Sequence, residues 1–420
     1  MLTVVALTML TSASSGQTQA EANVIDRVPD YVATRGSGGG DEPQSTVRHH
    51  DGWLRIDGSG GQDGYFERPG LHMSFKRAPD GGRYDSLMIN QGSGVDLWQP
   101  ERKKTEKRVT YLAETCAIWD LVSSPRVTGS KHVFDRDCVT SDGIIVAHGR
   151  AAEDGGILEP PEWRLTSLTR TAVAEKDVSP PADLFDWRNY AGFAAPMSAP
   201  GTGFEVDFVT KMEGGIAPAG DGVRYTKRHF PWVRTDTRFK NGDWTVKIEN
   251  LQNHAQLWFY TEKNGSYAHL SISEPRTWMR DRGSDAGQER LIVKSGTLLG
   301  EACKITSDLS GERQWTEWRT ADGIELKYEA EGGRWANPEE WTAVDLQRRP
   351  VDLSEVMPPE EIFDRARWGL SRQEPAAFNP LTPYARGWCA EDVAKRMFGA
   401  SAGRGQYDRR RSRLRGDERI

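Results

Sequence analysis

Alternating apolar and polar positions, broken by short glycine-containing turns, recur along the chain and predict an antiparallel β protein. The segments 234–248 and 258–272 each place an Asn-Gly pair between alternating flanks, which favours a two-residue hairpin because both turn residues tolerate positive φ. The segment 75–89 has the same length as the latter and places Gly81-Gly82 at the turn. Few segments keep apolar residues at helical spacing. We therefore predict a mainly β fold, with antiparallel sheets and one or two helices per domain.

Short motifs recur in the same order about 180 residues apart, which indicates an internal duplication. One short match would be chance, whereas six matches in the same order are a strong signal. The pairs are PDYVATR (29–35) with FEVDFVTK (204–211), RHHDGWLRID (48–57) with RHFPWVRTD (228–236), AETC (113–116) with GEAC (300–303), TSDGI (140–144) with TADGI (320–324), LTRTAV (168–173) with LQRRPV (346–351), and PPADLFD (180–186) with PPEEIFD (358–364).

The repeats divide the chain into two homologous β domains, which we place at residues 23–190 and 204–368. The segment 191–203 is rich in small residues and proline and is typical of a linker. Each domain ends on a Pro-Pro pair followed by acidic residues, which predicts the start of a helix. The extension 369–420 has no counterpart in the first half. We expect it to hold a short helix at 389–399 and then a disordered basic tail.

The N-terminal residues 1–20 resemble a signal peptide, because a short apolar segment precedes small residues. Thr18 and Ala20 would occupy the −3 and −1 positions of the cleavage site, although the usual positive start is missing. We expect the protein to be periplasmic or secreted. No apolar run reaches the eighteen or so residues that a transmembrane helix needs, so we predict no transmembrane segment.

Charge and motif content argue against several function classes. The chain has 55 basic and 61 acidic side chains and a formal net charge of −6, so no strong positive field favours nucleic acid. The G-x-S-x-G, H-E-x-x-H and P-loop patterns are absent. His49, His50 and His229 lack a surrounding ligand pattern. We therefore predict no catalytic residues, no cofactor and no metal, and we expect the basic segment 409–415 to be solvated.

The four cysteines are Cys116, Cys138, Cys303 and Cys389, and their spacing matches neither a zinc site nor a thioredoxin motif. In the repeat alignment Cys303 corresponds to Cys116, whereas Trp318 corresponds to Cys138. If adjacent strands carry the first two cysteines, a Cys116–Cys138 disulfide can form, and we favour it over two buried thiols. The pairing of Cys303 with Cys389 is left open, because it needs the C-terminal extension to fold back.

Two sets of side chains at alternate strand positions share one face of a strand. They are Trp53, Arg55 and Asp57 in the first half, and Trp232, Arg234 and Asp236 in the second. One interpretation is a recognition surface for a polar head group. The other, which we favour, is an Arg–Asp pair laid along a tryptophan that holds neighbouring strands together, because such pairs are common on half-exposed sheets.

The order of these motifs resembles the periplasmic lipoprotein-carrier (LolA-like) superfamily and its bacterial relatives. The shared string is an early strand, W-x-R-x-D, a hairpin, an E-x-C step, T-x-D-G-I and P-P-x-x-[LI]-F-D. The resemblance covers each half almost completely. It implies a half-open, strongly curved antiparallel sheet wrapped around helices, with a concave face that holds acyl chains in the carriers. It carries over no catalytic residues, and fold alone does not fix function.

Three functions are compatible with this sequence. The first is a non-enzymatic binding protein that holds a lipid or lipoprotein acyl chain, or another apolar segment, in a concave sheet; it predicts a connected apolar cavity in each domain, open to solvent. The second is an envelope protein-interaction or sensor module, which predicts filled domains and a flat aromatic patch. The third is a carbohydrate-facing module or enzyme, which predicts coplanar exposed tryptophan rings beside two carboxylates.

Overall fold

A computed structural model describes residues 28–370 with gaps, and in these ranges 22 strands form one antiparallel sheet. The gaps are at 38, 41, 80, 93–100, 123–132, 195–205, 218, 263–264, 274–290, 309–312 and 333–337. The predicted signal segment, most of the predicted linker and the chain from residue 371 onward, including the predicted helix and tail, lie outside the described residues. Within the described ranges, no helix has the length and apolar character to span a lipid bilayer.

The first half of the chain contributes strands β1 to β11. Their bounds are β1 (Tyr31–Ser37), β2 (Pro43–His50), β3 (Trp53–Gly58), β4 (Asp63–Arg68), β5 (Leu71–Arg77), β6 (Tyr84–Gln91), β7 (Glu101–Tyr111), β8 (Glu114–Val122), β9 (Val133–Thr140), β10 (Ile145–Arg150) and β11 (Trp163–Arg170). The helical turns α3 (Glu175–Val178), η1 (Ala182–Phe185), η2 (Trp187–Asn189) and α4 (Ala191–Ala194) follow, and α4 falls inside the predicted linker.

The second half contributes strands β12 to β22. Their bounds are β12 (Phe208–Ile216), β13 (Gly220–His229), β14 (Trp232–Phe239), β15 (Trp244–Asn250), β16 (Gln256–Thr261), β17 (Tyr267–Ser273), β18 (Leu291–Leu298), β19 (Glu301–Asp308), β20 (Arg313–Thr320), β21 (Glu325–Gly332) and β22 (Glu339–Gln347). The helical turns α5 (Leu353–Val356) and η5 (Glu360–Phe363) follow.

The two halves use the same strand order and meet edge to edge. From one edge to the other the order is β7–β8–β9–β10–β11–β1–β2–β3–β4–β5–β6–β17–β16–β15–β14–β13–β12–β22–β21–β20–β19–β18. The prediction of a mainly antiparallel β fold is confirmed. The joining of the two predicted sheets into one was not predicted from the repeat, and a common origin of the halves stays a prediction.

The seam between β6 and β17 is symmetric in sequence. When the hairpins 75–89 and 258–272 are aligned at equal length, Leu87 corresponds to Leu270 and Ile89 corresponds to Ile272. In the structure Leu87 pairs with Ile272, and Ile89 pairs with Leu270. Each strand thus carries the same leucine and isoleucine two residues apart, and the leucine of one strand lies opposite the isoleucine of the other. This is the arrangement expected where two copies of the same edge meet about a two-fold axis.

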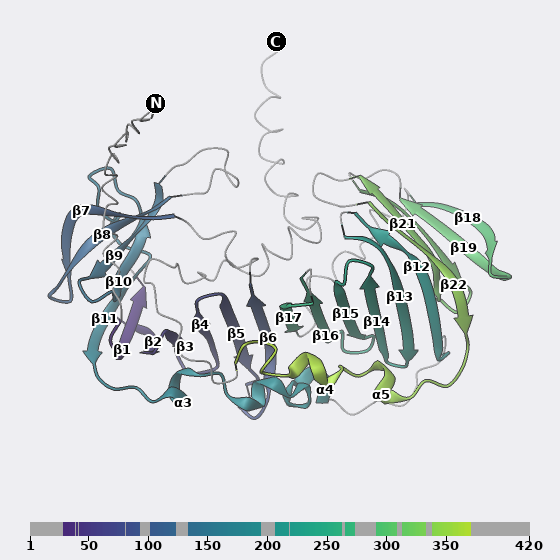
Figure 1. Ribbon diagram of the computed structural model, residues 1–420, viewed down its shortest axis with the longest axis horizontal. Helices are drawn as coiled ribbons and strands as arrows, with labels where there is room; N and C mark the ends of the chain where they lie inside the picture. Colours follow the sequence, from purple (N-terminus) through teal and green to yellow (C-terminus); the bar gives the residue numbers. More distant parts are fainter. Residues whose placement is uncertain are drawn as a thin grey trace, which may run out of the picture.

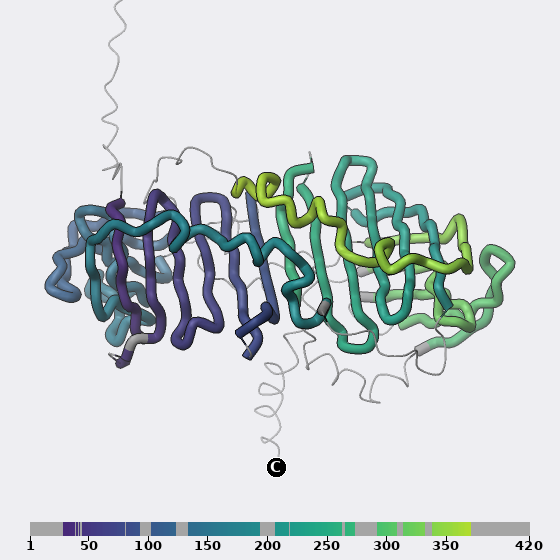
Figure 2. The backbone as a smooth tube through the Cα atoms, turned by 90° about the horizontal axis from the view of Figure 1, so that it is seen from below, coloured from purple at the N-terminus to yellow at the C-terminus, as the bar shows by residue number. Residues whose placement is uncertain are grey.

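The sheet bends so that its two ends rise on the same side, and the helical turns lie beneath its base (Figure 1). Viewed from below, the segments after β11 and after β22 cross the central strands (Figure 2). We call this side of the sheet the helical face, and it carries Arg55 and Phe66; the opposite side, which carries Leu54 and Tyr65, is the inner face.

The largest buried core lies between the helical face and the helical turns. It takes residues from β4 to β6, from β14 to β17 and from both turn segments, so it spans the seam. Its members include Phe66, Met73, Ile89, Leu184, Phe185, Tyr190, Trp232, Ile248, Leu270, Val356, Ile362 and Trp368. Two smaller cores fill the bent ends, one formed by strands of the first half and one by strands of the second.

The repeated motifs occupy equivalent places. Arg170, from LTRTAV, donates to Glu114 of AETC at 2.8 Å and to Asp142 of TSDGI at 2.6 Å, and so joins three motifs in one ionic cluster. Thr140 caps the same turn, because its hydroxyl accepts a hydrogen bond from the backbone N–H of Ile144 at 2.9 Å. The second half has the same cluster at Arg348, Glu301 and Asp322.

The hairpins themselves are confirmed, because 234–248 forms β14 and β15, and 75–89 forms β5 and β6 with Gly81 at φ 70°. The two-residue turn predicted at Asn241-Gly242 is wrong: the N–H of Phe239 donates to the carbonyl of Asp243 at 2.9 Å, so three residues form the loop, and of the pair only Gly242, at φ 92°, has a positive φ. Both Pro-Pro motifs start a single turn of 3₁₀ helix, at η1 and η5, rather than a longer helix.

A buried histidine lies on the inner face of the seam. The Nδ1 atom of His269 is 2.8 Å from Asn90 Oδ1 across the β6–β17 pair. Its ring stacks on Tyr260 with the centroids 5.3 Å apart. Burial lowers the pKa of His269 from its ordinary value of 6.5 to about 4.

This lowered pKa predicts a loss of stability in acid. Below pH 6.5 the unfolded chain binds a proton at His269 that the folded chain rejects, so the free energy of unfolding falls until the pH reaches the folded-state pKa of about 4. The loss should be about 3 kcal/mol, since each pKa unit corresponds to about 1.4 kcal/mol. Urea unfolding at pH 7 and pH 4 should show that His269→Gln loses less stability than the wild type by this amount. Equal losses in both proteins would contradict the assignment.

Candidate ligand-binding site

A partly enclosed cavity of about 550 Å³ lies on the inner face of the first half. This volume is within the range of small-molecule sites. The cavity is lined by side chains of β1 to β4, β7 and β9 to β11, together with Val28 and Gly143. The apolar and aromatic lining comprises Val28, Val47, Leu54, Ile56, Ile145, Leu165, Tyr31, Tyr65 and Trp163, and the charged or titratable lining comprises Arg35, His49, Glu67, Arg102, Asp135, Asp137, His148 and Glu162.

Strand alternation creates the apolar part of the wall. In β3, Leu54 and Ile56 point to the inner face, while the residues between them point to the helical face. Ile56 pairs with Val47 of β2 on one side and with Tyr65 of β4 on the other. The apolar lining thus forms a row across three adjacent strands.

A buried ionic cluster forms the opposite part of the wall. Arg102 Nη2 lies 2.9 Å from Asp137 Oδ2, and the side chains are only 4% and 0% exposed. The other oxygen of Asp137 lies 2.9 Å from His148 Nδ1. His148 Nε2 faces Glu162 at 3.5 Å and Asp135 at 3.8 Å. A charge buried in this way needs its partners, so the cluster fixes the polar wall in one arrangement.

Arg35 lies between two aromatic side chains at the same cavity. Its guanidinium carbon is 5.0 Å from the centroid of the Trp163 ring. Its Nη1 donates to Tyr65 Oη at 3.3 Å. Burial raises the pKa of Tyr65 to about 12, so this hydroxyl is protonated at neutral pH.

The second half has fewer charged and titratable side chains at four corresponding positions. The sequence match of 29–35 with 204–211 places Lys211 at the position of Arg35, and the strand register corrects it. The strand irregularity between Thr34 and Arg35 in β1 recurs between Lys211 and Met212 in β12, so Met212 stands where the first half has Arg35. By the same repeat alignment Phe208 replaces Tyr31, Tyr328 replaces His148 and Trp341 replaces Trp163. Trp341 is fully buried, whereas Trp163 is only half-buried.

A second cavity of about 620 Å³ lies elsewhere, among the ends of β12, β13 and β20 to β22. Its lining combines small and apolar residues, among them Gly214, Ile216 and Trp315, with the carboxylates Glu213, Asp221, Glu329, Glu331, Glu339 and Glu340. Of these residues, only Trp315 and Glu340 align with lining residues of the first-half cavity, Asp135 and Glu162.

The six residues of the predicted recognition surface all point to the helical face. Arg55 Nε donates to Asp57 at 2.9 Å, and Arg55 Nη1 donates to the carbonyl of Asp177 in α3 at 3.2 Å. Trp53 lies under the guanidinium of Arg68 at 4.9 Å. The second half repeats the arrangement: Arg234 donates to Asp236 and to the carbonyl of Met357, and Trp232 stacks on Phe193. These contacts anchor the helical turns to the sheet, and a recognition role stays a prediction.

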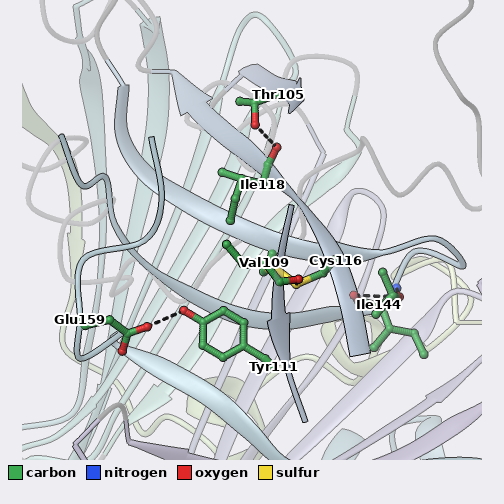
Figure 3. Close-up of a disulfide and its surroundings, with 9 residues drawn as sticks. Thr105, Val109, Tyr111, Cys116, Ile118, Ile144 and Glu159 are labelled. Atoms are coloured by element: carbon green, nitrogen blue, oxygen red, sulfur yellow. Dashed lines mark hydrogen bonds between the residues drawn. A yellow bond between two sulfur atoms is a disulfide. The ribbon is translucent and has the colours of Figure 1, made fainter. Parts of the chain in front are cut away.

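The predicted Cys116–Cys138 disulfide is present and links β8 to β9 in the core of the first bent end (Figure 3). Cys116 Sγ lies 3.6 Å from the carbonyl of Val109. In the second half Cys303 is a buried free thiol, and Trp318 packs against the core to which that thiol belongs. Cys389 lies outside the described residues.

The histidines flagged in the sequence contact carboxylates. His50 Nδ1 lies 2.8 Å from Asp30 Oδ2, and His229 Nδ1 lies 3.1 Å from Asp207 Oδ2. His49 stacks on Tyr31 and lines the cavity. Among the described residues, no group of three or more histidine, cysteine and acidic side chains has the geometry to hold a metal ion.

Comparison with known proteins gives only distant structural similarity. No protein-family model and no curated protein sequence matches the chain. Similar solved structures include PNGF-II, which is 11% identical with a TM-score of 0.24 over 36% of this chain and 29% of its own. The chain thus spans under a third of that protein's length.

Two further solved structures match more of their own length. An uncharacterised conserved protein from Thermus thermophilus is 10% identical, with a TM-score of 0.26 over 38% of this chain and 88% of its own. A putative outer membrane lipoprotein-sorting protein domain from Vibrio parahaemolyticus is 10% identical, with a TM-score of 0.15 over 41% and 93%. Similarity at this level assigns neither a family nor a function.

The buried cluster makes a prediction about stability. Replacing Asp137 with alanine should leave Arg102 and His148 without their shared carboxylate, and should lower the free energy of unfolding by about 3–5 kcal/mol. Glu317→Ala is the matched control, because Glu317 aligns with Asp137 and forms a more exposed pair with Arg319. It should cost less than about 1 kcal/mol. Urea unfolding of both variants measures the difference, and equal losses would refute the structural role of the cluster.

Proposed function

We propose that this chain is a non-enzymatic binding protein, and that its ligand site is the cavity of the first half. The observation that supports this proposal most directly is that one cavity has both a row of apolar side chains and a polar wall whose charged groups are paired with one another. A ligand that matches both has a hydrocarbon part and a polar head. An acyl chain with its head group belongs to this class.

Burial of hydrocarbon would drive binding. The side chains of Val47, Ile56 and Leu54 present an apolar surface on the inner face, and each Å² removed from water contributes about 25 cal/mol before ordering costs. The polar wall costs little to keep, because Asp137 is paired with Arg102 and His148 of the chain itself and needs no ligand as a partner. The site is therefore preorganised.

The two alternative functions have weaker support. A carbohydrate site would present coplanar exposed tryptophan rings, whereas the described cavity lining includes one tryptophan, Trp163, whose face is covered by Arg35. A protein-interaction module would have filled interiors. The buried core of the second half suits that description, but the first half keeps a cavity with an apolar row. We assign ligand binding to the first half and a supporting role to the second.

We further propose that the protein acts outside the cytoplasm. The disulfide between Cys116 and Cys138 supports this, because such bonds persist in oxidising compartments and are rare in the cytosol.

A cavity-filling substitution tests the proposal. Ile56→Trp places a large ring in the apolar row and should weaken binding of 1-dodecanol, measured by calorimetry, by about tenfold or more, since lost burial of a few CH₂ groups is worth at least about 1.4 kcal/mol. Thr235→Trp is the matched control, because Thr235 aligns with Ile56 in the second half. It should leave the affinity within about twofold. Thermal unfolding confirms that both variants are folded.

The wild-type chain gives an independent test. Native mass spectrometry of protein exported to the periplasm, with organic extraction of the same sample, should reveal a co-purifying amphiphile. If no amphiphile co-purifies and neither dodecanol nor a charged twelve-carbon amphiphile binds, the proposed function is wrong.

A further inference from the structure

The charged side chains of the first-half cavity are paired with one exception. The carboxylates each have a basic or histidine neighbour: Asp137 has Arg102 and His148, Glu67 has His72, and Asp135 and Glu162 face His148. Arg35 is different. Among the described residues, no carboxylate oxygen lies within 4.0 Å of its guanidinium.

Arg35 is nevertheless held in a defined position. The residue is half-buried, and its guanidinium lies over Trp163. Within the described part of the chain, the only hydrogen bond that the guanidinium donates is the one to Tyr65 Oη at 3.3 Å. A guanidinium has five N–H donors in a planar fork that fits a carboxylate or a phosphate. Most of these donors are therefore left for a ligand or for water.

The position of Arg35 relative to the apolar row suggests which ligand this is. Ala33, Val47, Ile56 and Tyr65 are opposed across β1 to β4, and Arg35 follows Ala33 by two residues on the same strand. A hydrocarbon chain lying along Val47 and Ile56 would thus bring its head group to Arg35. In the second half Met212 stands at the position of Arg35, and the arginine that lies over the aligned Trp341 is Arg224, which is already paired with Glu339 at 2.7 Å.

The net charge of the lining is a competing effect. Four carboxylates and two arginines leave an excess of negative charge if both histidines are neutral. This excess lies mainly around His148, where Glu162 and Asp135 flank a ring that already contacts Asp137. The charge of the ligand that Arg35 binds therefore depends on the groups that contact Arg35, and not on the net charge of the whole lining.

We propose that Arg35 is an anion clamp: it binds the carboxylate or phosphate head group of an amphipathic ligand whose hydrocarbon part lies on the apolar row. Trp163 and Tyr65 hold the guanidinium so that its free N–H groups face the cavity. This inference rests on the proposed function and adds to it the charge of the ligand.

Four probes with the same twelve-carbon chain test the clamp on the wild-type protein. Laurate or dodecyl phosphate should bind at least about tenfold more tightly than 1-dodecanol, because a hydrogen-bonded ion pair adds about one to two orders of magnitude in affinity. Dodecyltrimethylammonium should bind no better than 1-dodecanol. The stronger of the two anions identifies the head group as carboxylate or phosphate.

The variant Arg35→Met installs the residue found at the aligned position of the second half. It should remove the preference for the anion, with a loss of about tenfold to a hundredfold for that probe and less than about twofold for 1-dodecanol. Arg35→Lys keeps the charge and should restore part of the preference. Tyr65→Phe removes only the hydroxyl and should lower the affinity for the anion by a smaller factor. This variant gives a test even if Arg35→Met does not fold.

The outcomes separate the two proposals. If 1-dodecanol binds but the anions bind no more tightly, or if dodecyltrimethylammonium binds best, the clamp is wrong and the binding function stands. If Arg35→Met weakens all four probes equally, Arg35 supports the cavity without reading the head group, and the clamp is wrong. If none of the four probes binds the wild type, the proposed function itself fails.

Discussion

The pairing of β6 with β17 is the constraint on which this architecture depends. It joins two curved sheets into one and removes two edges that would otherwise expose unpaired backbone groups. The pairing buries leucine and isoleucine from both strands on the helical face, where they join the largest core. The turn segments then reach across the seam: Phe193 of the first half stacks on Trp232 of the second, and Arg68 donates to the carbonyl of Gly369. Each half therefore helps to cover the other.

The two halves have the same strand order and the same scaffold contacts, but their inner faces carry different side chains. Ionic clusters around Arg170 and Arg348 close equivalent turns, and the tryptophan-lined Arg–Asp pairs hold equivalent helical turns. These features maintain the scaffold in both halves. The inner face diverges, because Arg35 gives way to Met212 and a half-buried tryptophan gives way to the fully buried Trp341. The two halves thus share a scaffold and differ in the side chains of the inner face.

Local sequence signals predicted the local structure well. The hairpins followed from turn chemistry, such as Gly242 in the left-handed region, and the disulfide followed from comparing Cys116 and Cys138 with their counterparts. The seam was missed because pairing between two strand edges depends on contacts distant in sequence. An apolar cavity was expected in each half, but its charged lining was missed for a related reason: His148 and Arg35 come together only through the curvature of the sheet. The replacement of Arg35 by Met212 could not be read from the sequence, because the motif match placed Lys211 there and only the strand register corrects it.

The central claim is that the first half, and not the second, holds the hydrocarbon part of a ligand. The most direct test is a crystal structure grown with 12-bromododecanoic acid, because bromine is located by its anomalous scattering. The account predicts bromine, with the attached chain, within the first-half cavity beside Leu54, Ile56 or Val47. Bromine among Phe208, Trp341 and their neighbours in the second half, or a first-half cavity without ligand in crystals that bind the acid elsewhere, would contradict it.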